Sequence, residues 1–458
     1  MTYVFAGIFL LMILYICKFM IFDSESVIAN SYNTRQDKLA ERVIRGDIVS
    51  SDGVVLATNQ YLEDGSYYRY YPYGNMFAHA VGFSTNGKSG VELTANYYLL
   101  TSNANIFERT KKALQEEKNM GDTIVTTLDY HLQSTAYNAL GYGKGAVVVM
   151  EPDTGKILAM VSKPDFNPND IDAVWQSVTD GTAADNTILL NRATQGLYPP
   201  GSTFKTLTTL EYMRENSNWE DYHFTCSGED VFNSVTIHCY NSTVHGEEDL
   251  ADSLAYSCNT SFSNIGTSLD MDKFHDLCED FLFNDTLPYG GNYNKSSFVL
   301  DGDSDKSLIP QTVIGQGDTQ ISPLHNAMIM STIANGGVMM KPYLVEGIEN
   351  YEGVSVKRFT PSAYKRLLTV SEAQELTTLL EGVVDYGTGY GVNTDAYSVA
   401  GKTGTAEFNA EGQSHSWFVG FSNVENPDIV VCVVIEDADS SGIRAVSVAR
   451  QIFDAYYQ

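Results

Sequence analysis

The stretch that most constrains the fold of this chain is residues 198–206, Tyr-Pro-Pro-Gly-Ser-Thr-Phe-Lys-Thr. Pro199, Pro200 and Gly201 interrupt any regular structure that precedes them. Ser202 follows at once, and because serine is a favoured N-cap residue, the pattern predicts a helix that begins there. Apolar residues then recur about every third position, which indicates one buried helical face: Phe204, Leu207, Leu210 and Met213.

Ser202 and Lys205 lie three residues apart, so their side chains are neighbours on a helix. A serine hydroxyl is a weak nucleophile until a base accepts its proton, and a buried lysine can have a pKa low enough to be that base. A Ser-x-x-Lys match alone is a weak signal, because the same spacing arises by chance in capped helices with a solvated lysine. The rest of the chain must supply partners before the pair indicates catalysis.

Length and charge limit the classes of protein that this chain can belong to. Its 458 residues suffice for two or three domains and at least one large core. It carries 28 Lys and Arg against 57 Asp and Glu, a net charge of −29 that is spread along the chain. Phosphate binding needs clustered cations, so the balance argues against nucleic acid as a partner.

Residues 4–22 are apolar apart from Lys18 and are long enough to span a bilayer. Lys18 lies near the end of the segment, where its amine can reach the interface. No small-x-small cleavage motif follows, so residues 1–22 are predicted to be an uncleaved anchor, with a buried N-terminal helix as the alternative. Residues 1–3 carry no Lys or Arg, so charge does not set the orientation.

The order of predicted elements indicates an α+β layered domain. A polar segment at 31–41 is predicted to be helical, and apolar runs on either side of residues 51–53 predict a hairpin. Further strands are expected at 124–128, 145–150, 156–161, 397–400, 416–421 and 429–436, and further helices at 129–140, 248–268, 323–335, 371–384 and 445–457. Strands at both ends with helices between them predict one sheet built from the two ends of the domain.

The six cysteines contain no C-x-x-C pair, which argues against a zinc ribbon or a thioredoxin-type site. Cys226 and Cys239 bracket a short turn-rich loop, and His238 and His245 lie close by in the sequence. Three interpretations stay open: a disulfide in an oxidising compartment, free thiols, or a bound metal. Cys432 lies in an apolar run and is predicted to be a core residue.

Two further short motifs offer partners for Ser202 and Lys205. Ser257, Cys258 and Asn259 lie in or at the end of a predicted helical stretch and offer a hydroxyl and an amide. Residues 401–405 follow an apolar run, and their glycines let a substrate backbone approach closely. There Thr403 and Thr405 offer hydroxyls and backbone N–H groups, and Lys402 a charge suited to a carboxylate.

The order S-x-x-K, S-x-N, K-T-G resembles that of penicillin-binding proteins and class A β-lactamases. Segments around the motifs are similar to the transpeptidase domain of class B penicillin-binding proteins, namely 200–205, 245–246, 315–317, 334–337, 400–407 and 417–421. Residues 45–48, 69–72 and 87–92 resemble the N-terminal pedestal of that class. The resemblance covers nearly the whole chain.

This resemblance implies a penicillin-binding/β-lactamase-like fold, in which helices sandwich an antiparallel sheet. The implied domains are a transmembrane anchor at 1–22, a small extended pedestal at 23–130 and a transpeptidase domain at 131–458. The pedestal is short for the class, and no glycosyltransferase region precedes it, so a bifunctional class A enzyme is not expected. Cys258 stands at a position of the middle motif where the family tolerates it.

The implied activity is D,D-transpeptidation of peptidoglycan stem peptides, with β-lactams acylating the same serine. Ser202 would attack the penultimate D-Ala carbonyl while Lys205 accepts its proton, and Ser257 and Lys402 would relay a proton to the leaving amine. Asn259 would hold an amide of the donor. The hydroxyls of Thr403 and Thr405, with Lys402 nearby, would bind the terminal carboxylate, and Gly404 between them would also belong to the substrate-binding site. The backbone N–H groups of Ser202 and Thr405 would form the oxyanion hole.

The resemblance implies no metal and no organic cofactor. It implies a single-pass protein of the cell membrane with its catalytic domain on the extracytoplasmic side, and a polytopic glycan-polymerising glycosyltransferase as partner. Rival functions are a D,D-carboxypeptidase, a membrane-anchored β-lactamase or β-lactam sensor, and a non-enzymatic scaffold. The sequence leaves open whether the chain serves division, elongation or sporulation.

Overall fold

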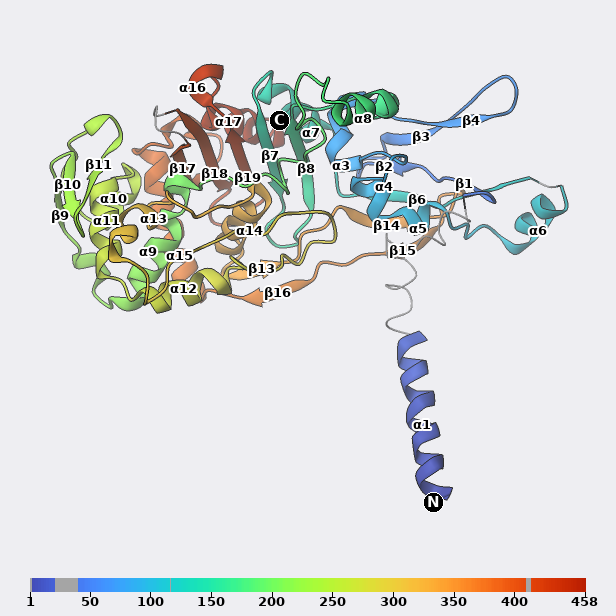
Figure 1. Ribbon diagram of the computed structural model, residues 1–458, viewed down its shortest axis with the longest axis horizontal. Helices are drawn as coiled ribbons and strands as arrows, with labels where there is room; N and C mark the ends of the chain where they lie inside the picture. The colour runs from blue at the N-terminus through green and yellow to red at the C-terminus, as the bar shows by residue number, and fades with distance from the viewer. Residues whose placement is uncertain (1, 21–39, 116, 409–412) are drawn as a thin grey trace.

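The computed structural model describes residues 2–20, 40–115, 117–408 and 413–458. Figure 1 shows the pedestal strands at one end of the molecule, the large catalytic sheet in the middle and a group of helices with strands β9–β11 at the other end. The segment predicted to be helical at 31–41 lies largely outside the described residues.

The first helix, α1 (Thr2–Lys18), has 17 residues, and its side chains are exposed from Tyr3 onward. Within the described parts of the chain, no helix combines the length and the apolar character that crossing a membrane requires. The anchor predicted at 1–22 therefore stays a prediction.

The pedestal contains a six-stranded mixed sheet with the order β15-β14-β6-β2-β3-β4. Its strands are β2 (Ile48–Val49), β3 (Val55–Tyr61), β4 (Tyr67–Tyr70), β6 (Thr123–Thr126), β14 (Val345–Glu349) and β15 (Ser355–Arg358). The hairpin predicted around residues 51–53 is confirmed, because β2 and β3 pair antiparallel with Ile48 opposite Ala57. Strands β14 and β15 come from far later in the chain, so residues of the catalytic half complete the pedestal sheet.

A buried carboxylate joins the three pedestal segments that carry the family resemblance. Glu92 has a fully buried side chain, and the guanidinium of Arg69 donates to its Oε1 from Nε at 2.7 Å. Arg45 forms a second ion pair with Glu92, and the hydroxyl of Tyr71 donates to the same carboxylate at 3.2 Å. Burial alone would raise the pKa of Glu92, but Arg45 and Arg69 hold it below its usual value.

Replacing Glu92 with glutamine is expected to destabilise the pedestal by about 3–5 kcal/mol, because it leaves two largely buried guanidinium groups without a countercharge. Thermal unfolding of the full-length chain in detergent measures the loss, and hydrogen exchange in β3 and β4 assigns it to the pedestal. Glu63→Gln is the matched control, since Glu63 is exposed. Equal stability of the two variants would contradict the role of Glu92.

The catalytic domain is built on a five-stranded antiparallel sheet with the order β17-β18-β19-β7-β8. Its strands are β7 (Gly145–Met150), β8 (Ile157–Lys163), β17 (Val399–Glu407), β18 (Ser414–Ser422) and β19 (Val430–Ile435). The prediction of one sheet from the two ends of the domain is confirmed, because β19 from the C-terminal part pairs with β7 from the beginning.

Helices cover both faces of this sheet. Successive side chains of a strand point to opposite faces, and here the side chains on both faces are apolar and need to be buried. Along β19, Val431 and Val433 pack with α7 (Tyr130–Leu140) and α17 (Ala445–Tyr456) on one face. Val430, Cys432 and Val434 belong to the core on the other face, which α14 (Pro323–Ala334) covers. The core position predicted for Cys432 is therefore confirmed, and its side chain is fully buried.

The remaining elements form the rest of the pedestal, the helical insert and its small hairpins. The helices are α3 (Ala78–Val81), α4 (Gly90–Thr94), α5 (Asn96–Leu99), α6 (Ile106–Leu114), α8 (Ile171–Thr179), α9 (Lys205–Glu215), α10 (Leu250–Ala255), α11 (Asn259–Ser268), α12 (Met271–Asp280), α13 (Ile309–Thr312), α15 (Val370–Asp385) and α16 (Ala438–Ser441). The short strands are β1 (Val43–Ile44), β5 (Asn119–Met120), β9 (Phe224–Cys226), β10 (Glu229–Phe232), β11 (Val235–His238), β12 (Gly246–Glu248), β13 (Val338–Met340) and β16 (Ala363–Arg366).

Candidate active site

Ser202 lies in a 3-10 turn, η5 (Gly201–Thr203), directly before helix α9. The predicted N-cap role of Ser202 is wrong, since its side chain makes no capping hydrogen bond and α9 begins at Lys205. The backbone passes from the 3-10 turn into the α-helix, and Phe204 N–H donates to Gly201 O at 3.0 Å. Ser202 is half-buried, and its hydroxyl is not used for capping. The buried helical face predicted at Phe204, Leu207, Leu210 and Met213 is confirmed.

Glycines allow strand β17 to lie directly against the Ser202 turn. Gly201 has φ +52°, and a Cβ added to it would meet Thr405 O at 2.7 Å. Gly404 faces the turn from the strand, where a Cβ would lie 3.0 Å from Pro200 O. Gly201 N–H also donates to Gly315 O at 2.9 Å. The K-T-G segment therefore lies beside the serine, although two hundred residues separate them in the sequence.

Lys205 is fully buried, and its amine joins the first motif to the second. Nζ donates to Ser257 O at 2.7 Å and to Asn259 Oδ1 at 2.8 Å, and it lies 3.3 Å from Ser257 Oγ. Burial lowers the pKa of Lys205 to about 8, and the nearby Cys258 and Cys239 thiols oppose this shift. The two nearest acceptors use both N–H groups of a neutral amine, so its lone pair remains for a hydroxyl proton.

Ser257 and Cys258 lie in a sharp turn between α10 and α11, and Asn259 is the first residue of α11. The single helix predicted over 248–268 is therefore wrong, because Ser257 has φ +58°, a left-handed conformation that breaks the helix. Cys258 then caps α11 by accepting from Ser261 N–H at 3.4 Å. Asn259 Nδ2 donates to His238 O at 2.9 Å, which fixes the amide beside strand β11. A strained residue held this way by its neighbours is typical of a functional turn.

Lys402, Thr403, Gly404 and Thr405 lie on β17 itself, whereas the predicted strand ended at residue 400. Along the strand Lys402 and Gly404 are buried, while Thr403 is half-buried and Thr405 exposed. Burial lowers the pKa of Lys402 well below its usual value, and the charge of Lys205 lowers it further. Strand β17 is at the edge of the sheet, so one side of its backbone is not paired with β18 and can bind an extended peptide.

Thr388 is a member of this site that the sequence did not indicate. Its hydroxyl lies 2.6 Å from that of Thr403, and its backbone N–H donates to Ala255 O at 3.0 Å. A Cβ on the preceding Gly387 would meet Ala255 O at 2.3 Å, so a glycine is needed there. The Gly-Thr-Gly pattern at 387–389 was the only sequence signal, and it is too common to be specific.

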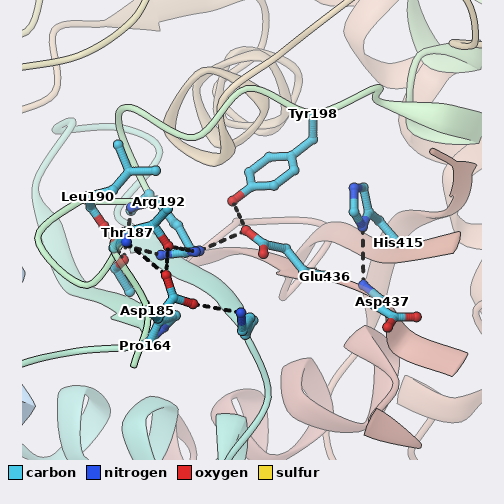
Figure 2. A network of polar contacts seen from close by, with 12 residues as sticks. Pro164, Asp185, Thr187, Leu190, Arg192, Tyr198, His415, Glu436 and Asp437 are labelled. Atoms are coloured by element: carbon cyan, nitrogen blue, oxygen red, sulfur yellow. Dashed lines mark hydrogen bonds and ion pairs between the residues drawn. The ribbon is translucent and has the colours of Figure 1, made fainter. Parts of the chain in front are cut away.

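A polar network fixes the segment that leads into the serine turn. Figure 2 shows Tyr198 and Arg192 both pointing toward the carboxylate of Glu436, with donor–acceptor distances of 2.6 and 2.7 Å. The indole N–H of Trp417 donates to Pro199 O at 3.1 Å. These contacts join the segment before Ser202 to β18 and to the residue that follows β19, and no sequence pattern indicated them.

The structure therefore brings the three predicted motifs together. Lys205 contacts Ser257 and Asn259 directly, the turn of Ser202 packs against β17, and the charge of Lys205 lowers the pKa of Lys402. This constellation offers a hydroxyl beside a buried amine of lowered pKa and an open strand edge with hydroxyl groups. It is equipped for acyl transfer from an extended peptide that ends in a carboxylate.

Comparison with known proteins agrees with this geometry. The sequence profile of the penicillin-binding protein transpeptidase domain matches residues 145–454, and that of the penicillin-binding protein A dimerisation domain matches residues 45–124. The chain belongs to the family of penicillin-binding proteins with a transpeptidase domain, and its two matched regions are those of a class B member.

Individual relatives cover nearly the whole chain. The peptidoglycan D,D-transpeptidase PbpA of Mycolicibacterium smegmatis is 30% identical over 433 residues, covering 88% of this chain and 87% of the relative. A D,D-transpeptidase domain from Eggerthella lenta superposes with a TM-score of 0.80 at 32% identity, covering 91% of this chain and 98% of that one. The imipenem acyl-enzyme of penicillin-binding protein A from Mycobacterium tuberculosis superposes with a TM-score of 0.83 at 27% identity, covering 92% and 100%.

Proposed function

We propose that this chain is a peptidoglycan D,D-transpeptidase that cross-links stem peptides through an acyl-enzyme on Ser202. The observation that carries the proposal is the buried amine of Lys205, which is hydrogen-bonded to Ser257 and Asn259 and lies one helical turn after Ser202. Relatives of similar length named as peptidoglycan D,D-transpeptidases support the activity. Solved acyl-enzyme complexes of a similar protein with β-lactams support acylation by these drugs.

Acylation begins when Ser202 Oγ attacks the penultimate D-Ala carbonyl of the donor and its proton passes to neutral Lys205 Nζ. The backbone N–H groups of Ser202 and Thr405 stabilise the resulting oxyanion, a contribution of about 3–4 kcal/mol per donor in comparable enzymes. Collapse of the tetrahedral intermediate breaks the bond to the terminal D-Ala. Lys205 returns the proton to the leaving amine through the hydroxyl of Ser257, which lies 3.3 Å from Nζ.

The donor peptide lies along the open edge of β17. Thr403 and Thr405 hydroxyls and the charge of Lys402 bind the terminal carboxylate, and Thr388 orients Thr403 through their 2.6 Å contact. Gly404 lets the peptide backbone approach the strand. Asn259 holds an amide of the donor, and its own orientation is set by His238 O and Lys205. An amine of a neighbouring glycan strand then displaces Ser202 from the acyl-enzyme.

Residues 1–22 anchor the chain in the cell membrane, with the catalytic domain on the extracytoplasmic side. The apolar side chains of α1 support this, because they are exposed all along the helix and no other part of the described chain covers them. The pedestal lifts the catalytic domain from the membrane and contacts a polytopic glycan-polymerising glycosyltransferase. Peptidoglycan lies outside the membrane, which is where a transpeptidase has its substrate.

The choice of acyl acceptor separates the transpeptidase from its rivals. The full-length chain in detergent is incubated with a stem peptide ending in D-Ala-D-Ala and with a second peptide that carries a free side-chain amine. We expect mainly the cross-linked dimer, because a transpeptidase transfers the acyl group from Ser202 to an amine rather than to water. Mass spectrometry separates the products.

Release of D-Ala with only the hydrolysed donor would indicate a carboxypeptidase and would contradict the proposal. A penicillin adduct that disappears within minutes would indicate a β-lactamase. Ser371→Ala serves as the control for the fold, since Ser371 is exposed on α15.

A further inference from the structure

Four potential metal ligands gather directly behind the Ser257–Asn259 turn. The side-chain ligand atoms of Cys226, Cys239, His245 and Cys258 all lie within 4.8 Å of one another. The three thiols are buried, and the imidazole is half-buried. They come from four separate segments: the end of β9, the residue after β11, the residue before β12 and the cap of α11. The spacing is C-x12-C-x5-H-x12-C, which differs from that of a zinc ribbon. The sequence left a metal near Cys226, Cys239 and His245 open as one of three interpretations, but it did not indicate Cys258 as a ligand.

Three of the six distances between these ligand atoms agree with the edges of a tetrahedron around a zinc ion. Zinc bonds of about 2.3 Å to sulfur and about 2.0–2.1 Å to nitrogen place two sulfur ligands about 3.8 Å apart and a sulfur and a nitrogen about 3.6 Å apart. The Sγ atoms of Cys226 and Cys239 are 3.6 Å apart, and those of Cys239 and Cys258 are 3.7 Å apart. Cys226 Sγ lies 3.4 Å from His245 Nδ1.

A disulfide accounts for this arrangement less well. A disulfide needs two sulfurs at about 2.05 Å, and pairing any two of these thiols would leave the third and the imidazole without a role. All six cysteines are free thiols in the structure. Three thiolates and one imidazole are a donor set that binds zinc in preference to calcium or magnesium.

A buried carboxylate beside the cluster is an independent sign of a cation. Glu248 on β12 is 3% exposed, and neither of its oxygens has a hydrogen-bond partner within the described part of the chain. The charge of His245 acts on this carboxylate, and the side chain of Cys258 is its neighbour. An unpaired carboxylate is costly to bury, and a nearby cation bound through His245 would compensate it.

We propose that Cys226, Cys239, His245 and Cys258 bind one structural zinc ion. The ion ties strands β9, β11 and β12 to the turn between α10 and α11. A closed site with four protein ligands is structural, so it supplies no chemistry to the peptide bond. The proposal revises the expectation of a metal-free protein and leaves catalysis itself to the side chains described above.

The metal would also position catalytic groups, an inference that rests on the proposed function. Cys258 stands between Ser257 and Asn259, and the carbonyl that accepts from Asn259 Nδ2 belongs to His238, the neighbour of Cys239. Cys258 is thus adjacent in sequence to both residues that accept hydrogen bonds from Lys205. Cys239 is adjacent to His238, whose carbonyl orients Asn259. Metal ligation also keeps three neighbouring thiols reduced in the oxidising compartment proposed for this domain.

The metal content of the purified full-length chain tests the site directly. After dialysis against metal-free buffer, elemental analysis should give about one zinc per chain, the stoichiometry of a four-ligand structural site. Replacement by Co²⁺ should produce thiolate-to-metal charge-transfer absorption and the d–d bands of tetrahedral cobalt. Cys226→Ser and His245→Ala should lose the metal. Cys278→Ser and Cys432→Ser should keep it, since both cysteines are buried outside the cluster.

The proposal would be overturned if the wild-type protein contained no bound metal, or if it showed a two-dalton mass deficit from a Cys226–Cys239 disulfide. This test holds even if the variants fail to fold. A strong chelator should slow acylation by fluorescent penicillin about 10- to 100-fold, and added Zn²⁺ should restore it. An unchanged acylation rate after complete zinc removal would refute the positioning role of the metal. It would not contradict the zinc site itself. Bound zinc in a chain that no penicillin acylates would instead refute the proposed function.

Discussion

Ser202→Ala is expected to abolish the covalent adduct that fluorescent penicillin forms with the wild-type chain. The variant lacks the oxygen that becomes acylated, and the hydroxyls of Ser257 and Thr403 are held by Lys205 and Thr388. Removal of the nucleophile in another serine acyl-transfer enzyme lowers turnover by about 10⁶-fold, so no residual label is expected here. Gel fluorescence and intact-protein mass measure the adduct.

The stability of the folded Ser202→Ala variant should be nearly the same as that of the wild-type chain. The Ser202 hydroxyl does not cap a helix, and the turn is held by Gly201, whose N–H donates to Gly315 O. The unfolding temperature of Ser202→Ala should therefore equal that of the control Ser371→Ala, which keeps full labelling. Labelling of Ser202→Ala at the wild-type level would show that another residue is the nucleophile and would contradict the mechanism.

The sequence indicated which segments carry the candidate site. Ser202 and Lys205 were singled out by their spacing, and Ser257, Asn259 and Lys402 by their resemblance to the family motifs. The structure brings these segments together. The sheet from both ends of this domain followed from the positions of the predicted strands along the chain, and its antiparallel pairing followed from the family resemblance.

Contacts between distant segments could not be predicted, because no local pattern encodes them. Strand β14 was not among the predicted strands, and nothing in residues 345–349 indicates that it pairs with β6 of the pedestal. The network of Arg192, Tyr198 and Glu436 joins residues up to 244 positions apart. The helix break at Ser257 was missed because serine has no strong preference for positive φ, and tertiary contacts impose it.

Lys205→Met is expected to slow penicillin acylation by about 10²- to 10⁴-fold, the usual contribution of a general base. Methionine fills the buried space of the lysine stem but cannot accept the Ser202 proton. The wild-type rate should rise about tenfold per pH unit at low pH and level off above about 8, because burial lowers the pKa of Lys205 to about 8 and only the neutral amine is a base. Stopped-flow measurement of acylation between pH 6 and pH 9.5 gives the profile.

The pH profile distinguishes a base from a lysine that only holds the site together. If Lys205 accepts the proton, the Met variant loses both rate and the pH-dependent rise, whereas a purely structural loss would lower the rate and keep the rise. Lys163→Met is the matched control, since Lys163 is a half-buried lysine whose pKa is also lowered by burial, and it bonds Tyr137 O and Gly141 O away from the site. An unchanged profile in Lys205→Met would assign the base to another group, and Lys402 would be the next candidate because burial lowers its pKa as well.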